Sequence, residues 1–468
     1  MPKPILFNAF YMGSPSQAWA GLWAHPKAQT DRYCDLAFWQ DLARTAERGL
    51  IDGIFFADQL GVMDAYEGRP DALIRSGGMC PINDPMMVIP AMAAVTENLC
   101  FGVTGNTTYE QPYLLARRLS TLDHLTKGRI AWNIVTGIAP AAAMAMGQKP
   151  VAHDKRYDIA DEYMDLMYKL WEGSWEDDAV LRDKANQIYA DPAKVHMIKH
   201  HGEYLSSEAM FICEPSPQRT PFLFAAGSSG RGSAFAGKHG EAAFMSASDM
   251  GYSKRVVDGY RNAAIENGRA PDDIKVINAA TIIVAPTEAE ARALQEEYQQ
   301  YASFEGNLAM LSGWTGIDFS KYGPDEPIEH AEGNAIQSIL DSMTKHNTGE
   351  KVTPRALARF ARTPGREAFI IGSPSQVCDT IIEWVEKVGV DGFNLHRTVE
   401  PGGLGAFVDL VVPELRDRGY YKTEYDAGTM REKMQPGRGP KLASDHYGAR
   451  FKFGASAPHD EEIVASLI

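Results

Sequence analysis

Residues 99–136 read LCFGVTGNTTYEQPYLLARRLSTLDHLTKGRIAWNIVT. Residues 99–104 and 130–136 are apolar runs of strand length, and residues 112–124 between them have the apolar spacing of a helix. A strand, a helix and a second strand in this order form the parallel βαβ unit. The nearly continuous apolar character of both strands is typical of a parallel sheet covered on both faces.

The same alternation continues in both directions along the chain, which predicts an α/β fold. Eight apolar runs favour a closed (β/α)8 TIM barrel, with an open doubly wound sheet as the alternative that shares the local pattern. The predicted strands cover residues 5–10, 53–57, 99–104, 130–136, 222–226, 242–245, 275–284 and 392–395. The predicted helices cover residues 36–48, 84–96, 112–124, 154–171, 233–239, 253–267, 288–301, 375–388 and 404–417.

Local signals mark several helix ends. Asp84 precedes Pro85, which predicts an N-cap followed by the first helical residue. Gly49 and Gly240 directly follow predicted helices, where we expect the left-handed conformation.

Two long stretches interrupt the alternation. Residues 173–219 are polar, and residues 304–366 are rich in glycine, proline and charge. Loops of this length in a compact domain usually serve binding, so we expect both insertions to extend from the carboxyl-terminal face, where barrel enzymes have their active sites. Residues 1–435 then form the barrel domain, and residues 436–468 form a polar C-terminal tail.

The composition of the 468 residues limits the partners. Hydrophobic residues make up 44%, which is enough for a large core and excludes a disordered chain. The net charge of −15 argues against a nucleic-acid partner. The five cysteines are widely spaced, which favours a reducing compartment over a disulfide framework. No signal peptide and no apolar run of membrane-spanning length is evident, so we expect a cytoplasmic protein.

Residues 225–232, AAGSSGRG, follow a predicted strand and lead into a predicted helix. Glycines let an anion approach the backbone, hydroxyls donate to it, and the N–H groups of the first helical turn attract it. A phosphate cradle and a plain flexible turn both fit this pattern.

Polar residues also stand at strand ends and at one helix start. Asp58 and Thr104 end two predicted strands, where a barrel places its ligand contacts, although an N-cap and ordinary turn chemistry are the simpler readings. His153 and Tyr157 lie four residues apart on one helix face, where they flank a ligand or merely pack.

A metal site is not expected. His196 and His200 have the spacing of a zinc pair if their segment is helical, but Lys199 lies beside them and no glutamate takes the metalloprotease position. We interpret this segment, with His201, as part of a solvated lid.

Long runs of the chain resemble the bacterial luciferase-like flavin-dependent monooxygenases, in the subgroup of the nitrilotriacetate, long-chain alkane and dibenzothiophene sulfone monooxygenases. The resemblance covers about residues 4–435. The runs that carry it are STLDHLTKGR (120–129), AWNIVT (131–136), YDIADEY (157–163), LWEGSW (170–175), CEPSPQR (213–219), SGWTGI (312–317), DGFNL (391–395) and PGGL (401–404).

The resemblance implies a two-component enzyme that uses FMN in its reduced form, FMNH2, together with O2. A separate NAD(P)H-dependent flavin reductase supplies the FMNH2. It also implies a homo-oligomer, a homodimer or a homotetramer. The implied flavin contacts are Asp58 and Thr104 at the ring, His153 and Tyr157 near the ribityl chain and phosphate, and Ser228 and Ser229 at the phosphate.

The chain departs from this subgroup in the loop after the first strand. Ser14 stands at the family's cysteine position and Gln17 at its histidine position, which argues against alkanes and dibenzothiophene sulfone as substrates. Phe10, Trp19, Phe56 and Phe244 suggest an apolar or aromatic pocket, although packing in the core explains the phenylalanines equally well.

We therefore expect oxidation of a small apolar or heteroaromatic compound, with a sulfone or related xenobiotic as one class. Cleavage of a C–S, C–N or C–halogen bond is the expected chemistry, and no catalytic residue is assigned. The alternatives are a flavin-binding relative without turnover and a deazaflavin-dependent oxidoreductase.

Overall fold

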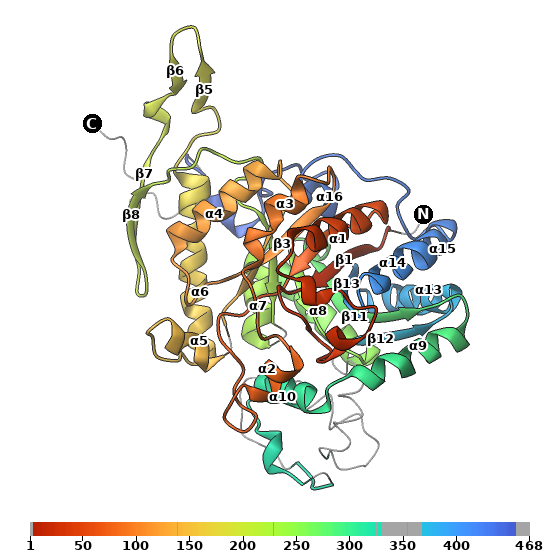
Figure 1. Ribbon diagram of the computed structural model, residues 1–468. Coiled ribbons are helices and arrows are strands. Elements are labelled where there is room, and N and C mark those ends of the chain that lie inside the picture. Colours follow the sequence, from red (N-terminus) through yellow and green to blue (C-terminus); the bar gives the residue numbers. More distant parts are fainter. Residues whose placement is uncertain are drawn as a thin grey trace.

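Eight parallel strands close into a barrel in the computed structural model, which describes residues 3–137, 139–227, 229–323, 325–328, 353 and 367–454 (Figure 1). Each strand pairs with the next in the chain, and the last pairs with the first. This closure confirms the (β/α)8 barrel and excludes the open sheet. The strands are β1 (Leu6–Tyr11), β2 (Gly53–Phe56), β3 (Cys100–Asn106), β4 (Ile130–Val135), β9 (Phe222–Ala226), β10 (Ala242–Met245), β11 (Lys275–Val284) and β13 (Gly392–His396).

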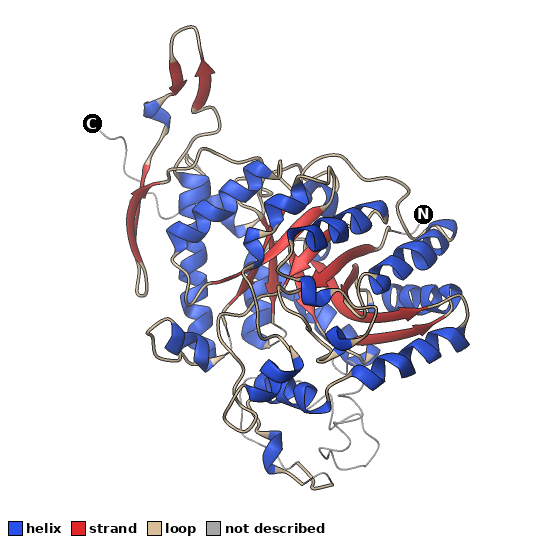
Figure 2. Cartoon of the chain, in the orientation of Figure 1, coloured by secondary structure: helices blue, strands red, loops and turns tan. Residues whose placement is uncertain are grey.

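Helices surround the strands (Figure 2). The N-cap predicted at Asp84 is confirmed, because its side chain accepts a hydrogen bond from the backbone N–H of Met86. No helix in the described part of the chain is long and apolar enough to span a bilayer. The helices of the barrel wall are α1 (Leu36–Arg48), α3 (Ile89–Ala93), α4 (Pro112–Leu125), α6 (His153–Tyr168), α7 (Gly230–His239), α8 (Met250–Glu266), α9 (Glu288–Tyr301), α13 (Pro374–Glu383), α14 (Gly402–Ala406) and α15 (Val412–Asp417).

Side-chain alternation along the strands divides the core in two. On β1, Phe7 packs toward the helices, whereas Phe10 points into the barrel. The interior is filled mainly by aromatic and aliphatic side chains. Met430 and Met434 of α16 (Met430–Met434) join this inner cluster, so the amino-terminal end of the barrel is closed.

The first insertion is not where the sequence analysis placed it. Residues 173–219 connect η4 (Lys169–Gly173) to β9, so they begin and end at the amino-terminal ends of the strands. In Figure 1 their outer hairpin projects at the end of the molecule opposite to α2 and α10. A helix-to-strand connection always returns to that end of a barrel, so the expected carboxyl-face position is wrong. The insertion forms the hairpins β5 (Val180–Asp183) with β6 (Ile188–Ala190) and β7 (Met197–His201) with β8 (Ser206–Met210).

The second insertion does reach the carboxyl-terminal face in its described part. Helix α10 (Phe304–Thr315) packs beside α2 (Asp71–Ser76), which belongs to the loop after β2. The backbone N–H of Ala20, in the loop after β1, donates to Asn307 Oδ1 on α10 at 2.8 Å. Most of residues 324–366 lie outside the described residues.

The chain after the barrel also packs on it. Phe451, in the described part of the tail, is buried and stacks on Tyr168 of α6 with 5.6 Å between ring centroids. Near the same end, Arg431 of α16 forms a buried ion pair with Glu241 at 2.6 Å.

Candidate active site

Aromatic side chains form the floor of the barrel mouth, at the carboxyl-terminal ends of the strands. The ring of Phe10 on β1 lies 5.4 Å from Phe55 on β2 and 5.3 Å from Phe244 on β10. Phe244 is more exposed than the strand residues before it, so its ring borders the open mouth. The fold thus brings together three rings from distant parts of the sequence.

The assignment of Phe56 to this pocket is wrong. Phe56 packs against Trp39 of α1, 5.4 Å away between ring centroids, on the outer side of the barrel. Successive side chains of a strand point to opposite faces, so Phe55 holds the inward position.

A cavity of about 520 Å³ opens beside Asp58 and Thr104. Met79, Tyr109 and Glu110 also line it. Two residues that the sequence analysis chose as strand-end contacts therefore share one cavity.

Both polar side chains in this cavity are held in place. The backbone N–H of Gln59 donates to Asp58 Oδ1 at 2.8 Å, and burial raises the pKa of Asp58 to about 7. A carboxyl group with this pKa both donates and accepts hydrogen bonds near neutral pH. The hydroxyl of Thr104 donates to the carbonyl of Phe56 and accepts from Asn133 Nδ2, each at 2.8 Å.

The turn between β9 and α7 has the features of an anion cradle. Ser229 is the N-cap of α7, and its Oγ accepts from the backbone N–H of Gly232 at 3.1 Å. Gly227 has a φ of +130°, and a Cβ at this position would lie 2.6 Å from the Tyr157 hydroxyl. The free N–H groups of the first turn of α7 are available to an anion.

The predicted phosphate-side residues lie together around this turn. The ring of His153, the first residue of α6, is 5.3 Å from that of Tyr157. Tyr157 also makes a side-chain hydrogen bond with Ser229, and burial raises the pKa of the Tyr157 phenol. Ser228 lies outside the described residues.

Arg231, in the same turn, is engaged elsewhere. Its guanidinium lies 2.6 Å from Asp158 Oδ1 and 3.5 Å from Asp161 Oδ2, both on α6. We therefore assign the attraction for an anion at this turn mainly to backbone N–H groups and hydroxyls.

The loop after β1 carries the two residues that differ from the resembled subgroup. Ser14 is fully buried, its hydroxyl donates to the carbonyl of Ser16, and its own carbonyl accepts from Arg397 Nη2 at 2.7 Å. Gln17 is 5% exposed, and neither the nitrogen nor the oxygen of its amide has a hydrogen-bond partner among the residues that the structure describes. A buried amide without partners is costly, so Gln17 is a candidate contact for a polar ligand atom.

The sequence analysis missed a polar group on this floor. His396, the last residue of β13, stacks on Phe10 with 4.6 Å between ring centroids and 15° between ring planes. Its Nδ1 lies 3.0 Å from Glu367 Oε1, which also accepts from the hydroxyl of Thr281 at 2.9 Å. The strand-end rule that selected Asp58 and Thr104 would have found His396, because it directly follows a predicted strand.

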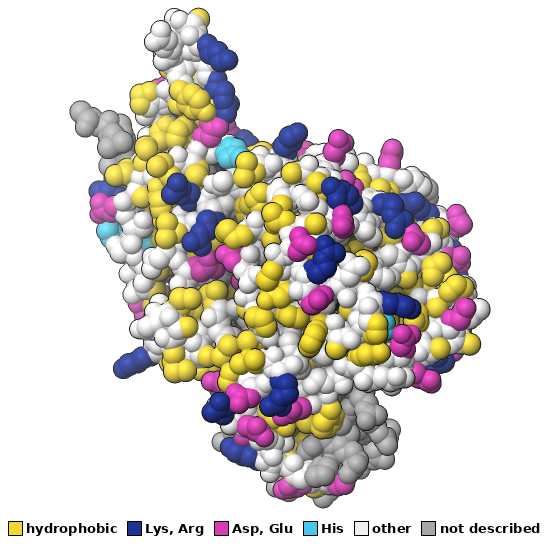
Figure 3. Space-filling view, in the orientation of Figure 1, with side chains coloured by type: hydrophobic (Ala, Val, Ile, Leu, Met, Phe, Trp, Pro, Cys, Tyr) yellow, Lys and Arg dark blue, Asp and Glu magenta, His cyan; other side chains and the backbone are white. Residues whose placement is uncertain are grey.

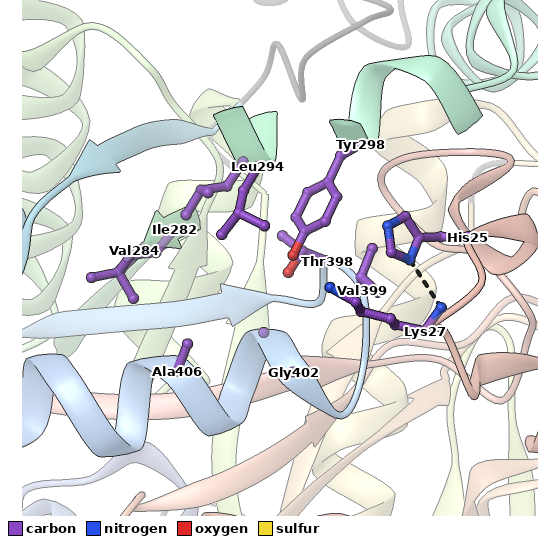
Figure 4. Close-up of a pocket in the computed structure, with 12 residues that line it drawn as sticks. His25, Lys27, Ile282, Val284, Leu294, Tyr298, Thr398, Val399, Gly402 and Ala406 are labelled. Atoms are coloured by element: carbon purple, nitrogen blue, oxygen red, sulfur yellow. Dashed lines mark hydrogen bonds between the residues drawn. The ribbon is translucent and has the colours of Figure 1, made fainter. Parts of the chain in front are cut away.

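A second cavity, of about 210 Å³, lies outside the barrel (Figure 4). It lies between α9, β11 and α14, and Tyr298 and His25 point toward it in the close-up. It contains no residue of the predicted site.

The histidines of residues 196–201 make hydrogen bonds with glutamate side chains. His200 and His201 lie on the strand β7, not on a helix, and pair with Glu162 at 3.1 Å and Glu208 at 3.0 Å. His196 pairs with Glu176 at 2.8 Å. Within the described ranges, no cluster of three or more His, Cys, Asp or Glu side chains could hold a metal ion.

A closed parallel barrel, with an open cavity at one mouth and a turn that has the features of an anion cradle, is typical of barrel enzymes that bind a phosphorylated ligand. Within that class, the chain belongs to the luciferase-like monooxygenase family, whose model matches residues 19–392. This confirms the family expected from the sequence and the enzyme class, a flavin-dependent monooxygenase.

Two curated relatives match nearly the whole chain. The chain is 46% identical to the dimethyl-sulfide monooxygenase of Hyphomicrobium sulfonivorans, covering 97% of this chain and 94% of the relative. It is 44% identical to the long-chain alkane monooxygenase of Geobacillus thermodenitrificans, covering 97% and 99%.

Two solved structures are similar to this chain over nearly their whole length. DmoA from Hyphomicrobium sulfonivorans matches with a TM-score of 0.91 and 44% identity, over 99% of each chain. A riboflavin lyase, solved with modified FMN and riboflavin, matches with a TM-score of 0.89 and 38% identity, over 96% of this chain and 100% of the lyase.

Proposed function

We propose that this chain is the oxygenase component of a two-component system that oxidises a small, mainly apolar organic compound. It binds FMNH2 made by a separate NAD(P)H-dependent flavin reductase and uses O2. The observation that carries this proposal is the common position of the Ser229 cradle and the Asp58–Thr104 cavity, since both belong to the carboxyl-terminal ends of the barrel strands.

The residues fit a flavin mononucleotide. Gly227 has no room for a side chain beside Tyr157, so an anion meets bare backbone at this turn. Ser229, Tyr157 and His153 offer hydroxyl and imidazole groups to the phosphate and ribityl chain. Asp58 and Thr104 present one carboxyl and one hydroxyl group to the polar edge of the ring.

The chain's own groups bind, orient and exclude water. When bound, FMNH2 supplies the electrons that reduce one atom of O2 to water while the other atom enters the substrate. The carboxyl of Asp58, with a pKa near 7, would hold or release a proton at the cavity that it lines. The packed rings of Phe10, Phe55 and Phe244 keep the floor dry.

The walls of the mouth suit an apolar or heteroaromatic substrate. Met79 lines the cavity of about 520 Å³ and belongs to a buried cluster with Met12, Met63 and Met310, and methionine adapts to irregular apolar ligands. The relatives' names specify dimethyl sulfide, long-chain alkanes and dibenzothiophene sulfone. The unpaired amide of Gln17 favours a substrate with a polar atom over a plain alkane.

We also propose a homodimer or homotetramer in the cytoplasm. The projecting hairpin of β5 and β6 carries exposed Leu181, Ile188 and Tyr189, and apolar side chains are visible along it (Figure 3). A second copy of the chain would cover such side chains. Sedimentation of a monomer would contradict this assembly.

The function is tested by incubating the chain with FMN, NADH, a flavin reductase and O2, and by following oxygenated products from a panel of sulfides, sulfones and heteroaromatic compounds. We expect binding of FMNH2 and a product from at least one class. Flavin binding with release of peroxide alone would indicate a relative without turnover. If the chain binds a deazaflavin more tightly than FMN, the deazaflavin and not FMN is its cofactor.

A further inference from the structure

We propose that His396 contacts the substrate through its Nε2 atom, which acts as a hydrogen-bond acceptor. The site then selects compounds that carry a hydrogen-bond donor next to an apolar body. This inference rests on the proposed function and specifies the substrate class at the same mouth.

The fold places His396 on the floor of the mouth. In the parallel ladder, His396 is paired with Phe10 on one side and with Thr281 on the other. All three therefore occupy inward positions at the same level of the barrel. The ring of His396 stacks on Phe10, which in turn contacts Phe55 and Phe244. The imidazole therefore brings a polar ring to a surface formed largely by Phe10, Phe55 and Phe244.

Glu367 fixes the tautomer of the imidazole. The side chains of His396 and Glu367 are 8% and 4% exposed, so water does not compete for their hydrogen bond. A carboxylate only accepts hydrogen bonds, and Oε1 of Glu367 already accepts from Thr281. When Glu367 is ionised, Nδ1 of His396 therefore carries a proton, and in the neutral imidazole Nε2 carries the lone pair. Glu367 is a positioning residue, because it acts through His396.

Among the described residues, the Nε2 atom of His396 has no hydrogen-bond partner. It is closed to solvent and accepts no hydrogen bond. An unsatisfied buried polar atom destabilises the fold, and in native proteins such atoms mark ligand contacts or strain. His396 stands at the end of its strand and is more exposed than the four strand residues before it, and its ring stacks on Phe10 at the carboxyl-terminal end of the barrel.

This arrangement predicts a particular chemical preference. An acceptor lone pair on an aromatic floor binds an alcohol, a thiol or an N–H compound with an apolar remainder. An alkane or a simple dialkyl sulfide forms no hydrogen bond with this acceptor, so its binding leaves Nε2 of His396 unpaired and gains no affinity from it.

The first test uses the chain without flavin. In ¹⁵N NMR spectra of the histidine side chains, the signals of His396 are assigned as those that the variant His396→Gln lacks. We expect their chemical shifts to be those of a neutral imidazole with a protonated Nδ1 and an unprotonated Nε2. The variant Glu367→Ala should shift that ring toward the Nε2–H form, and Glu367→Gln, which keeps an accepting oxygen, should shift it less. A protonated Nε2 in the wild-type chain would overturn the proposal.

The second test compares two substrates that differ by one hydroxyl, ethyl methyl sulfide and 2-(methylthio)ethanol, in the reconstituted system. We expect the wild type to prefer the alcohol by about tenfold in kcat/KM. His396→Phe, which keeps a ring on Phe10, should reduce the preference to less than threefold, mainly by raising KM for the alcohol. His396→Gln, whose amide oxygen approaches the Nε2 position, should restore part of it.

The outcomes separate this inference from the proposed function. If product forms without a preference for the alcohol, or if His396→Phe leaves that preference unchanged, the proposed role of His396 is wrong. The proposed monooxygenase function is unaffected by this result. A chain that binds no FMN overturns the proposed function and the selectivity with it. Thermal unfolding of each variant shows whether a lost preference arises from a damaged fold.

Discussion

The hydroxyl of Tyr157 on α6 lies so close to Gly227, at the end of β9, that a methyl group on Gly227 would be 2.6 Å from it. This contact joins the start of α6 to the turn before α7, and it explains why glycine occupies a position with a φ of +130°. The anion cradle depends on this close approach.

Gly227→Ala should therefore weaken FMN binding by at least tenfold and destabilise the protein by roughly 1–3 kcal/mol, because alanine is strained at this φ and meets Tyr157. The matched control is Gly230→Ala in the same turn, where an added Cβ has nothing within 4 Å. Titration of FMN by fluorescence and thermal unfolding check both variants. Equal FMN affinity in the two variants would place the anion elsewhere.

Ser229→Ala should reduce FMN affinity by about 1.5–3 kcal/mol, because a hydroxyl hydrogen bond to a charged phosphate is lost. It should also cost about 1 kcal/mol of stability, since Ser229 caps α7. Thr287→Ala removes a comparable cap from α9 and should lower stability without affecting FMN. Isothermal titration calorimetry with FMN distinguishes a binding role from a capping role.

Asp58→Asn should stabilise the flavin-free protein above pH 7 and leave it unchanged at pH 4. Burial raises the pKa of Asp58 from 3.8, its ordinary value, to about 7. The folded wild type therefore loses stability as the pH rises from about 4 to about 7, because the unfolded chain gives up this proton more easily. Because Asp58 is only partly buried, we expect a gain of about 1–2 kcal/mol at pH 8. Urea unfolding from pH 4 to pH 8 measures it, and a constant difference between variant and wild type across this range would refute the assignment.

Phe244→Leu should change KM for the substrate several-fold, whereas Phe56→Leu should leave KM unaltered. Phe244 borders the open mouth, and Phe56 packs against Trp39 outside the barrel. Both variants should lose about 1 kcal/mol of stability. A KM change for Phe56→Leu that equals the change for Phe244→Leu would contradict the separation of these two faces.

The barrel strands were predictable because each is an almost continuous apolar run. All eight predicted runs form barrel strands, with ends that differ by at most two residues. The short strand β12 (Ala368–Gly372) was not predicted. It pairs with residues 280–284 of β11, where that strand extends past its contact with β13. This partner is set by tertiary structure and not by the local sequence.

The four strands of the first insertion were missed for a different reason. They are short and mostly exposed, and burial alternates along β7 and β8, so they lack the long buried apolar runs of the barrel strands. Their place at the amino-terminal end follows from chain order, because a segment that comes after a helix and before a strand lies at that end of a barrel. The length of the insertion alone does not show at which end it lies.

The expectation for Gly49 and Gly240 was wrong in its mechanism. Their φ values are −81° and −77°, and Leu50 takes the left-handed conformation after α1. At Gly49 the constraint is space, because a Cβ would lie 2.4 Å from Val408. The sequence shows that a glycine follows a helix, but it does not show which side chain of the folded protein leaves no space for a Cβ there.

Part of the candidate site could be found locally, and part could not. Asp58, Thr104 and the turn around Ser229 lie at or next to the ends of predicted strands, so the barrel rule selected them as candidates without a structure. The pairing of Glu367 with His396 joins residues on either side of α13, and only the closed barrel brings their side chains to 3.0 Å. The inward position of Phe55 and the outward position of Phe56 depended on strand register, which a buried run of apolar residues does not reveal.

A crystal structure of the chain with FMN tests the central claim most directly. We predict that the phosphate lies against the Ser229 hydroxyl and the first-turn N–H groups of α7, with the flavin ring over the mouth beside Asp58 and Thr104. A phosphate bound at the end of another strand, or a ring directed away from Phe10 and Phe244, would contradict it.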